Sequence, residues 1–256
     1  MTLLALVVAF CLLGGVLSVI AAATFLVLPE GLRDRALPHF VSFAIGALLG
    51  AAFLALLPHA LEAPGVEDAH GIMGTVLLGL LAFFLLEKMV LWRHCHHGLC
   101  EPGHEHHHAV PGVLILVGDA IHNFVDGVLI AAAFLTDVHL GIVTAIAVAA
   151  HEIPQEVGDF AILLHSGFSR GRAFAYNILA SLTTVVGGLL AWFALAGVQD
   201  AVPYVLAIAA SSFIYVAVAD LIPGLHRRVN VGATVQQAAL IAAGVIVIYF
   251  SHSTLH

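Results

Sequence analysis

Eight apolar stretches of about 20 residues each constrain the fold of this chain more than any other feature of its sequence. A membrane-spanning helix needs about 20 predominantly apolar residues, because the hydrocarbon core of a bilayer is about 30 Å thick. Apolar residues make up 61% of the 256 residues and charged residues only 9%, whereas soluble domains contain about 25% charged residues. We therefore predict an all-α integral membrane protein with one transmembrane domain, residues 1–256. The predicted spans are about 3–28, 40–58, 71–92, 112–134, 140–165, 174–197, 201–222 and 235–254.

The basic residues indicate how these spans are oriented. All eight Lys and Arg residues lie in or beside the odd-numbered connections between spans, whereas the even-numbered connections contain Asp and Glu but no Lys or Arg. Connections rich in Lys and Arg remain in the cytoplasm. Both termini are therefore expected on the non-cytoplasmic side of a cell membrane, either the inner or the plasma membrane. The formal net charge of −8 disfavours nucleic acid as a partner.

Two of the predicted spans carry ionisable residues at the depth of the bilayer centre. The run from His151 to Asp159 contains one histidine, three carboxylates and one amide. A charged side chain at this depth costs about 2.5–3.5 kcal/mol even on lenient scales, and such residues mark ion pathways. In the preceding span, His122 and Asp126 lie four residues apart and so share one face of a helix. If the two helices are antiparallel neighbours, their polar stripes meet near the middle of the membrane, where a bound cation would neutralise the carboxylates.

Imidazole, carboxylate and amide groups in this pattern predict a divalent metal site. Pro154 lies inside the second run, and because it leaves the carbonyl of Ala150 without its helical partner, the helix is expected to bend and make room for an ion. Asp119 and Asp159 lie nearer the cytoplasmic ends of their spans and extend the polar path inward. His59, at the outer end of its span, is either a metal entrance or a hydrated helix end. The predicted metal ligands are His122, Asn123, Asp126, His151, Glu152, Gln155 and Glu156.

The connection at residues 93–111 is rich in side chains that bind transition metals. It contains seven of the 17 histidines and two of the three cysteines. No fixed tetrahedral spacing is present, so we predict a flexible cytoplasmic loop that collects metal ions rather than a structural zinc fold. A solvated polar loop is the alternative. The residues of the predicted metal-collecting loop are His94, Cys95, His96, His97, Cys100, His104, His106, His107 and His108.

The run His151-Glu152-x-x-Gln155 also shares part of the His-Glu-x-x-His motif of zinc hydrolases. The second histidine of that motif is absent, and a hydrolase would leave the polar stripe on the preceding span unexplained. We therefore predict no enzymatic activity and no cofactor. A zinc-dependent intramembrane metalloprotease is the alternative function.

A weak internal repeat relates the second and seventh spans. The second span closes on Leu57-Pro58-His59 and the seventh on Ile222-Pro223-Gly224, after similar Ala- and Gly-rich runs. By the count of connections, these spans run in opposite directions. An inverted repeat around the fourth and fifth helices is therefore predicted, as in many transporters with a site at the midplane.

The two polar runs resemble the two signature helices of a known transporter family. Residues 122–127 (His-Asn-Phe-Val-Asp-Gly) and 151–160 (His-Glu-Ile-Pro-Gln-Glu-Val-Gly-Asp-Phe) are similar to those of the ZIP (Zrt/Irt-like) divalent metal transporters, particularly the LIV-1-type branch. The resemblance extends to residues 42–60, 83–88 and 181–188 and covers nearly the whole chain.

This resemblance implies an eight-helix transporter that moves zinc, or a similar ion such as Fe²⁺, Mn²⁺ or Cd²⁺, toward the cytoplasm. Divalent ions and the lipid bilayer are then the expected partners, and homodimer formation is left open. Gln155 stands where the LIV-1 signature usually has a second histidine, and a neutral amide is a poorer zinc ligand, which leaves the metal preference open. The resemblance implies one site formed by His122, Asp126, His151 and Gln155, and a neighbouring site to which Asn123, Asp126 and Glu152 contribute.

Overall fold

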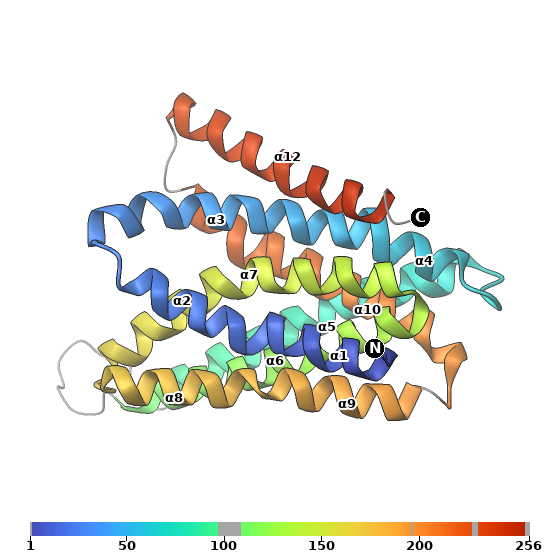
Figure 1. Cartoon of the computed structure of the whole chain (residues 1–256), viewed down its shortest axis with the longest axis horizontal. Helices are drawn as coiled ribbons and strands as arrows, with labels where there is room; N and C mark the ends of the chain where they lie inside the picture. The colour runs from blue at the N-terminus through green and yellow to red at the C-terminus, as the bar shows by residue number, and fades with distance from the viewer. Residues whose placement is uncertain (1, 97–108, 196, 227–229, 254–256) are drawn as a thin grey trace.

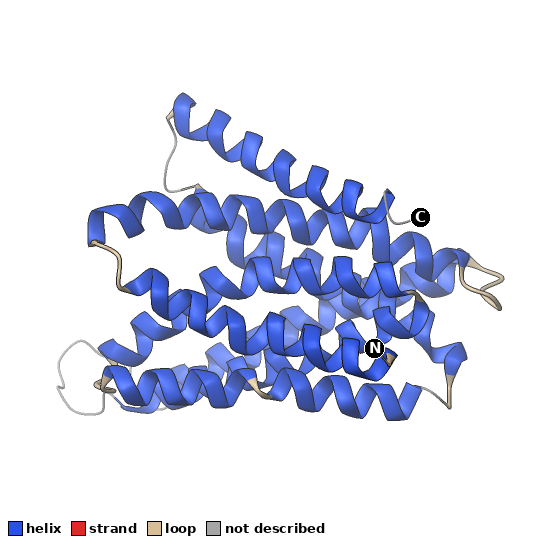
Figure 2. Cartoon of the chain, viewed as in Figure 1, coloured by secondary structure: helices blue, strands red, loops and turns tan. Residues whose placement is uncertain are grey.

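The computed structural model is a bundle in which eight long helical segments pack against one another (Figure 1). It describes residues 2–96, 109–195, 197–226 and 230–253, and every regular element among these residues is helical (Figure 2). Each long segment runs antiparallel to the one before it, so the connections alternate between the two ends of the bundle. In chain order the segments are α1 Leu3–Leu12 with η1 Leu13–Leu17 and α2 Ser18–Leu26; α3 Glu30–Ala51 with η2 Ala52–Leu56 and α4 Leu57–Glu62; α5 Ala69–His96; α6 Ala109–Thr136; α7 Val138–His165; α8 Arg170–Ser181 with α9 Thr183–Leu195; η3 Gln199–Ala201 with α10 Val202–Tyr215, η4 Val216–Leu221 and α11 Ile222–Leu225; and α12 Val231–Ser253.

Seven of these segments are long and apolar enough to cross a membrane. Among the eight long segments of the described chain, the one that fails this test is α7. It carries Glu152, Glu156 and Asp159 in addition to His151, which lower its mean hydropathy. The prediction of an all-α protein with several membrane-length helices is therefore confirmed, whereas hydropathy alone does not identify α7 as a span.

Glycines bring two pairs of helices into close contact. Where α6 crosses α9, Gly127 faces the carbonyl of Thr184 and Gly187 faces the backbone of α6, so that a Cβ at either glycine would overlap main-chain atoms. Gly46 and Gly244 make the same kind of contact between α3 and α12. Small residues at helix crossings let membrane helices approach closely enough for extensive van der Waals contact. These contacts hold α6, which carries half of the polar stripe, firmly against α9.

A connection of one residue fixes α6 beside α7. Asp137 is the only residue between Thr136, which ends α6, and Val138, which begins α7. Its backbone is extended (φ −157°, ψ 145°), and its carboxylate accepts hydrogen bonds from the backbone N–H groups of His139 at 2.7 Å and Leu140 at 3.1 Å. This cap satisfies N–H groups that have no partner within the helix. The tight reversal makes α6 and α7 antiparallel neighbours in direct contact.

The helices flanking the predicted metal-collecting loop are longer than the sequence analysis expects. Helix α5 continues to His96 and α6 begins at Ala109. His94, Cys95 and His96, predicted to lie in the loop, are therefore the last residues of α5. Between the apolar run and Gly98 the sequence contains no glycine or proline. The helix therefore continues through polar residues, because polar side chains by themselves do not end a helix. The remaining loop residues, His97, Cys100, His104, His106, His107 and His108, lie outside the described residues.

The contact between α6 and α9 generates a prediction about stability. Gly127→Ala should lower the midpoint of thermal unfolding, because its Cβ overlaps the Thr184 carbonyl and overpacking costs about 1–3 kcal/mol. Gly118→Ala is the matched control on the same helix, because a Cβ there meets nothing within 4 Å. The control should keep or raise stability, since Ala is favoured over Gly in helices by about 1 kcal/mol. Circular dichroism of both purified variants in one detergent measures the difference, and equal midpoints would contradict this packing.

Candidate metal centre

Four side chains from α6 and α7 converge inside the bundle. His122 and Asp126 lie one turn apart on α6, and His151 and Glu152 lie next to each other on α7. Each side chain offers one ligand atom, and these four atoms lie within 4.8 Å of one another. We call these four residues the histidine group. Their convergence follows from the four-residue helical spacing on α6 and from the antiparallel contact of the two helices.

The imidazole nitrogens of the histidine group lie close to each other and to carboxylate oxygens. Nε2 of His122 lies 3.1 Å from Nε2 of His151 and 3.3 Å from Oε1 of Glu152. Nε2 of His151 lies 3.4 Å from Oδ2 of Asp126. Two ring nitrogens and two carboxylate oxygens form a donor set that suits zinc and related transition metals.

The histidine group is almost completely removed from solvent. Asp126, His151 and Glu152 are at most 1% exposed, while the His122 side chain is 20% exposed. Within the described part of the chain, both carboxylate oxygens of Asp126 and Oε1 of Glu152 have no hydrogen-bond partner. Nδ1 of His151 lies 3.0 Å from the carbonyl oxygen of Ala147 and donates to it, which directs the lone pair of Nε2 toward the other ligands. A cation would stabilise these buried carboxylates.

Asn123 organises the carboxylates beside the histidine group. Its Nδ2 donates to Oδ1 of Asp119 at 2.8 Å and to Oε2 of Glu152 at 3.5 Å. Its Oδ1 accepts a hydrogen bond from the hydroxyl of Thr184 at 2.8 Å. Asn123 therefore turns its amide nitrogen, rather than its oxygen, toward the carboxylates. Sequence reasoning missed Thr184, because a single threonine in an apolar span commonly does no more than bond to a neighbouring helix.

A second group of acidic side chains adjoins the first. Asp119, Glu152 and Glu156 place carboxylate oxygens within 4.8 Å of one another, and all three residues are buried. We call them the carboxylate group, and Glu152 belongs to both groups. The structure thus brings Glu156 together with Asp119 rather than with the two histidines.

A cavity of about 540 Å³ extends from the histidine group. Its lining includes His122 together with Gln155 and Asp159, which the sequence predicted as site or path residues. The lining also includes Glu87, Tyr215 and Asp220, which sequence reasoning did not assign to the site. The Tyr215 hydroxyl donates a hydrogen bond to the Glu87 carboxylate. Asp220 had a sequence signal, because it is a carboxylate within the predicted seventh span. Most of the lining residues belong to the halves of their helices nearest the end of the bundle at which α3 and α6 begin; Figure 1 shows these helix starts.

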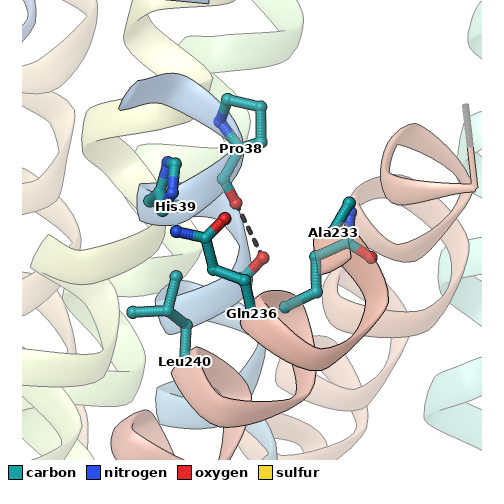
Figure 3. A pocket seen from close by; sticks show the side chains of 7 residues that line it. Pro38, His39, Ala233, Gln236 and Leu240 are labelled. Carbon is teal, nitrogen blue, oxygen red and sulfur yellow. Dashed lines mark hydrogen bonds between the residues drawn. The ribbon is translucent and has the colours of Figure 1, made fainter. Parts of the chain in front are cut away.

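A much smaller pocket lies between α3 and α12 (Figure 3). Pro38 and His39 from α3 face Gln236 and Leu240 from α12 around a volume of about 20 Å³. The hydroxyl of Ser42 donates a hydrogen bond to the carbonyl of Pro38 at 2.7 Å. Such a volume holds about one water molecule, so this pocket is too small to serve as a transport path.

His59 lies apart from both groups of candidate ligands. It belongs to α4, and its Nδ1 lies 2.9 Å from the carbonyl oxygen of Ala55. Among the described residues it joins no metal-binding cluster. Its role as a metal entrance stays a prediction.

The sequence profile of the family described as ZIP Zinc transporter matches residues 93–252. The chain belongs to the ZIP family. Among relatives of this ZIP chain, the zinc transporter ZIP13 of Pongo abelii is 36% identical over 227 residues, which are 82% of this chain and 65% of the relative. ZIP13 of Homo sapiens is 32% identical over 264 residues, or 82% of this chain and 69% of the relative. The zinc transporter ZIP4 of Mus musculus is 44% identical over 112 residues, or 44% of this chain and 17% of the relative. The chain therefore spans about two thirds of the length of these ZIP13 relatives.

Family membership decides two of the predictions. The resemblance to ZIP proteins inferred from the two signature helices is confirmed. Because ZIP proteins are transporters rather than enzymes, the prediction of no enzymatic activity is also confirmed, and the metalloprotease alternative loses its support. Together with its seven apolar helices, membership makes this ZIP chain an integral multi-pass membrane protein.

The geometry of the histidine group generates a prediction about zinc affinity. His151→Ala should weaken zinc binding to the purified protein by about tenfold or more, because it removes a buried ligand that is oriented by the Ala147 carbonyl. His165→Ala is the matched control, since His165 lies on the same helix but is exposed and outside both groups. Isothermal titration calorimetry in detergent compares the two variants with the unchanged chain. Equal affinities for all three proteins would remove His151 from the ligand set.

Proposed function

We propose that this ZIP chain transports divalent metal ions, zinc above all, toward the cytoplasm through the histidine group. The observation that carries the proposal is the convergence of two imidazole nitrogens and two carboxylate oxygens within 4.8 Å inside a bundle of membrane-length helices. The relatives named as zinc transporters agree with this donor set. Fe²⁺, Mn²⁺ and Cd²⁺ are the competing ions, because the same mixed set of nitrogen and oxygen ligands accepts them.

The cavity supports release toward the cytoplasm. Its carboxylates, Glu87, Asp159 and Asp220, lie between the histidine group and the end of the bundle at which α3 and α8 begin. That end carries Arg33 and Arg170, which marks the cytoplasmic side by the distribution of basic residues. A path lined by acidic groups attracts cations as they leave the centre. Gln155 lines this cavity, as His122 does.

Helix α7 is proposed as the eighth span despite its polar residues. It has 28 residues, and at about 1.5 Å per residue it exceeds the hydrocarbon thickness of about 30 Å. His151, Glu152 and Glu156 are buried against other helices, so its polarity is not presented to lipid. Helix α5, by contrast, exposes apolar side chains such as Leu78 and Leu85, as a surface in contact with lipid requires.

Two structural correspondences support an inverted repeat around α6 and α7. Helices α3 and α10 both lead into π-helical segments, η2 and η4, and each of these is followed by a short helix with a proline at its start, Pro58 and Pro223. The helix contacts correspond as well. The contact of α12 with α3 corresponds to that of α5 with α10. The contact of α2 with α7 corresponds to those of α8 and α9 with α6. If segments one, two and three are replaced by segments six, seven and eight, and α6 is exchanged with α7, each of these contacts becomes its counterpart. Transporters built from inverted repeats show this kind of correspondence.

The proposed orientation, with both termini outside the cytoplasm, generates a labelling prediction. Glu67→Cys should react with a membrane-impermeant maleimide on intact cells, whereas Gly171→Cys should react only after permeabilisation. Both positions are exposed, and a Cβ at Gly171 meets nothing within 4 Å. Both variants also carry Cys95→Ser and Cys100→Ser, so that the one native cysteine left is Cys11, which is buried. The reverse labelling pattern would place both termini in the cytoplasm.

The transport activity itself is tested by zinc uptake into liposomes that contain the purified chain. Asp126→Ala should reduce uptake to the level of empty liposomes, because it removes a proposed ligand and leaves the two histidines without the carboxylate that both contact. Asp200→Asn is the control, since it removes one negative charge at the opposite end of the bundle. Uptake is normalised to inserted protein. Undiminished uptake by the Asp126 variant would refute transport through the histidine group.

A further inference from the structure

An apolar groove of about 530 Å³ runs along the outer surface of the bundle between α6 and α8. The two helices begin at the same end of the bundle and run in the same direction (Figure 1). The groove positions on α6 recur every three or four residues and so form one face of that helix. They include Val113, Val117, Ala120, Ile121 and Phe124. Val113, Val117 and Ile121 are each more than half exposed, so no described helix covers this face.

The lining of the groove is suited to an apolar occupant. Among the described residues, no lining side chain has a buried nitrogen or oxygen without a partner. The hydroxyl of Thr183 lies 2.6 Å from the carbonyl oxygens of both Ala120 and Ala180, and so is paired within the protein. Apart from Thr183 and Tyr176, all lining side chains are apolar. The ring of Tyr176 packs edge-on against Phe168, with ring centroids 5.7 Å apart.

The length of the groove corresponds to one leaflet of a bilayer. From Val113 to Phe124, α6 advances by about 16 Å at about 1.5 Å per residue. Half of a hydrocarbon core of about 30 Å is about 15 Å. The residues of α6 and α8 that line the groove belong mostly to membrane-length apolar segments, so the groove faces lipid rather than water. An acyl chain from the leaflet at the end where α6 and α8 begin therefore matches the groove in length and polarity.

A basic residue lies at the end of the groove where the two helices begin. Arg172 precedes Tyr176 by four residues, so it lies one turn earlier on the groove face of α8. It is exposed, and within the described part of the chain no ion pair involves it. Side chains on a helix tilt toward its N-terminus. The guanidinium of Arg172 is therefore directed out of the apolar region, toward the level of the lipid headgroups.

We propose that this groove binds one anionic phospholipid, with an acyl chain along α6 and its phosphate at Arg172. The guanidinium matches the geometry of a phosphate group. A zwitterionic phospholipid supplies the same chain and phosphate, but its cationic group is repelled by Arg172, so the lipid with a net negative charge binds more tightly. The site is separate from the metal centre, because His122 and Asn123 lie on a different face of α6 from the groove. The lipid thus packs against the outer face of a helix whose inner face carries candidate ligands.

Native mass spectrometry of the purified full chain tests the assigned headgroup position. The chain is incubated with equal amounts of phosphatidylglycerol and phosphatidylcholine that carry the same acyl chains. The unchanged chain should retain one phosphatidylglycerol in preference to phosphatidylcholine. Arg172→Gln should lower this preference by about fivefold, which is the contribution of one basic residue near an anionic membrane surface. Arg170→Gln is the matched control, because it removes the same charge from the same helix on the side away from the groove.

A second pair of variants tests the groove itself. Val117→Trp should reduce the retention of both lipids, because the larger side chain occupies the middle of the groove. Val235→Trp is the matched control and should leave retention unchanged. Val235 is also more than half exposed, but it lies on α12, which contributes no residue to the groove.

Each outcome decides for or against the lipid site. Equal retention of the two lipids by the unchanged chain, an undiminished preference in Arg172→Gln, or undiminished retention by Val117→Trp would overturn it. If a variant does not elute as a single species in size-exclusion chromatography, thermal unfolding of the unchanged chain replaces it. Phosphatidylglycerol should raise the unfolding midpoint more than phosphatidylcholine or glycerol phosphate does, since a ligand of the native state stabilises it, and equal midpoints would refute the site. Zinc is absent from these measurements, so transport through the histidine group is tested independently.

Discussion

The burial of four carboxylates at the contact between α6 and α7 is the physical constraint on which the rest of the structure depends. Asp119 and Asp126 face Glu152 and Glu156 with little or no exposure to solvent. Neither helix can present such a surface to lipid, because charge in hydrocarbon is costly. The surrounding apolar helices therefore enclose the polar stripe, and α7, which is too polar to qualify as a span by hydropathy, packs against α2, α3, α6 and α12.

The geometry of the polar centre depends on contacts that contain no ligand. Asp137 reverses the chain in a single residue and thereby sets α7 beside α6. On the other side of α6, the close approach of Gly127 and Gly187 brings Thr184 near enough for its hydroxyl to bond Asn123. Asn123 in turn positions Asp119 and Glu152. The placement of the candidate ligands therefore rests on helix packing rather than on loops, and helix packing can keep side chains within the narrow tolerances that metal binding requires.

The two ends of the helix bundle differ in whether a cavity there reaches the histidine group. The cavity beside His122 is lined mostly by residues from the halves of their helices nearest the end of the bundle where α3 and α6 begin, whereas a pocket of about 220 Å³ at the opposite end, lined by Thr136 and Asp200 among others, includes no residue of either group. Under the proposed orientation, with both termini outside the cytoplasm, this arrangement corresponds to the inward-facing state of an alternating-access cycle. The π-helical segments η2 and η4, each before a proline, are places where the helical hydrogen-bond pattern already departs from the regular form.

The sequence by itself determined the membrane class and the family, and it named the four residues of the histidine group among seven predicted ligands, because apolar runs and a four-residue helical spacing are local properties of the chain. It placed Gln155, rather than Glu152, in one site with His122, Asp126 and His151, whereas the structure brings Glu152 to these three residues. It also indicated Asp119, Asp159 and Gln155 as polar positions near the site. Only the tertiary structure decided how these residues divide between the histidine group and the carboxylate group, since the neighbours of a helix depend on packing across the whole bundle. It placed Glu156 with Asp119 and brought Glu87 and Asp220 from distant spans to the same cavity as His122. It also turned the amide nitrogen of Asn123 toward the carboxylates, because the Thr184 hydroxyl, which comes from a helix 61 positions later in the chain, binds its oxygen.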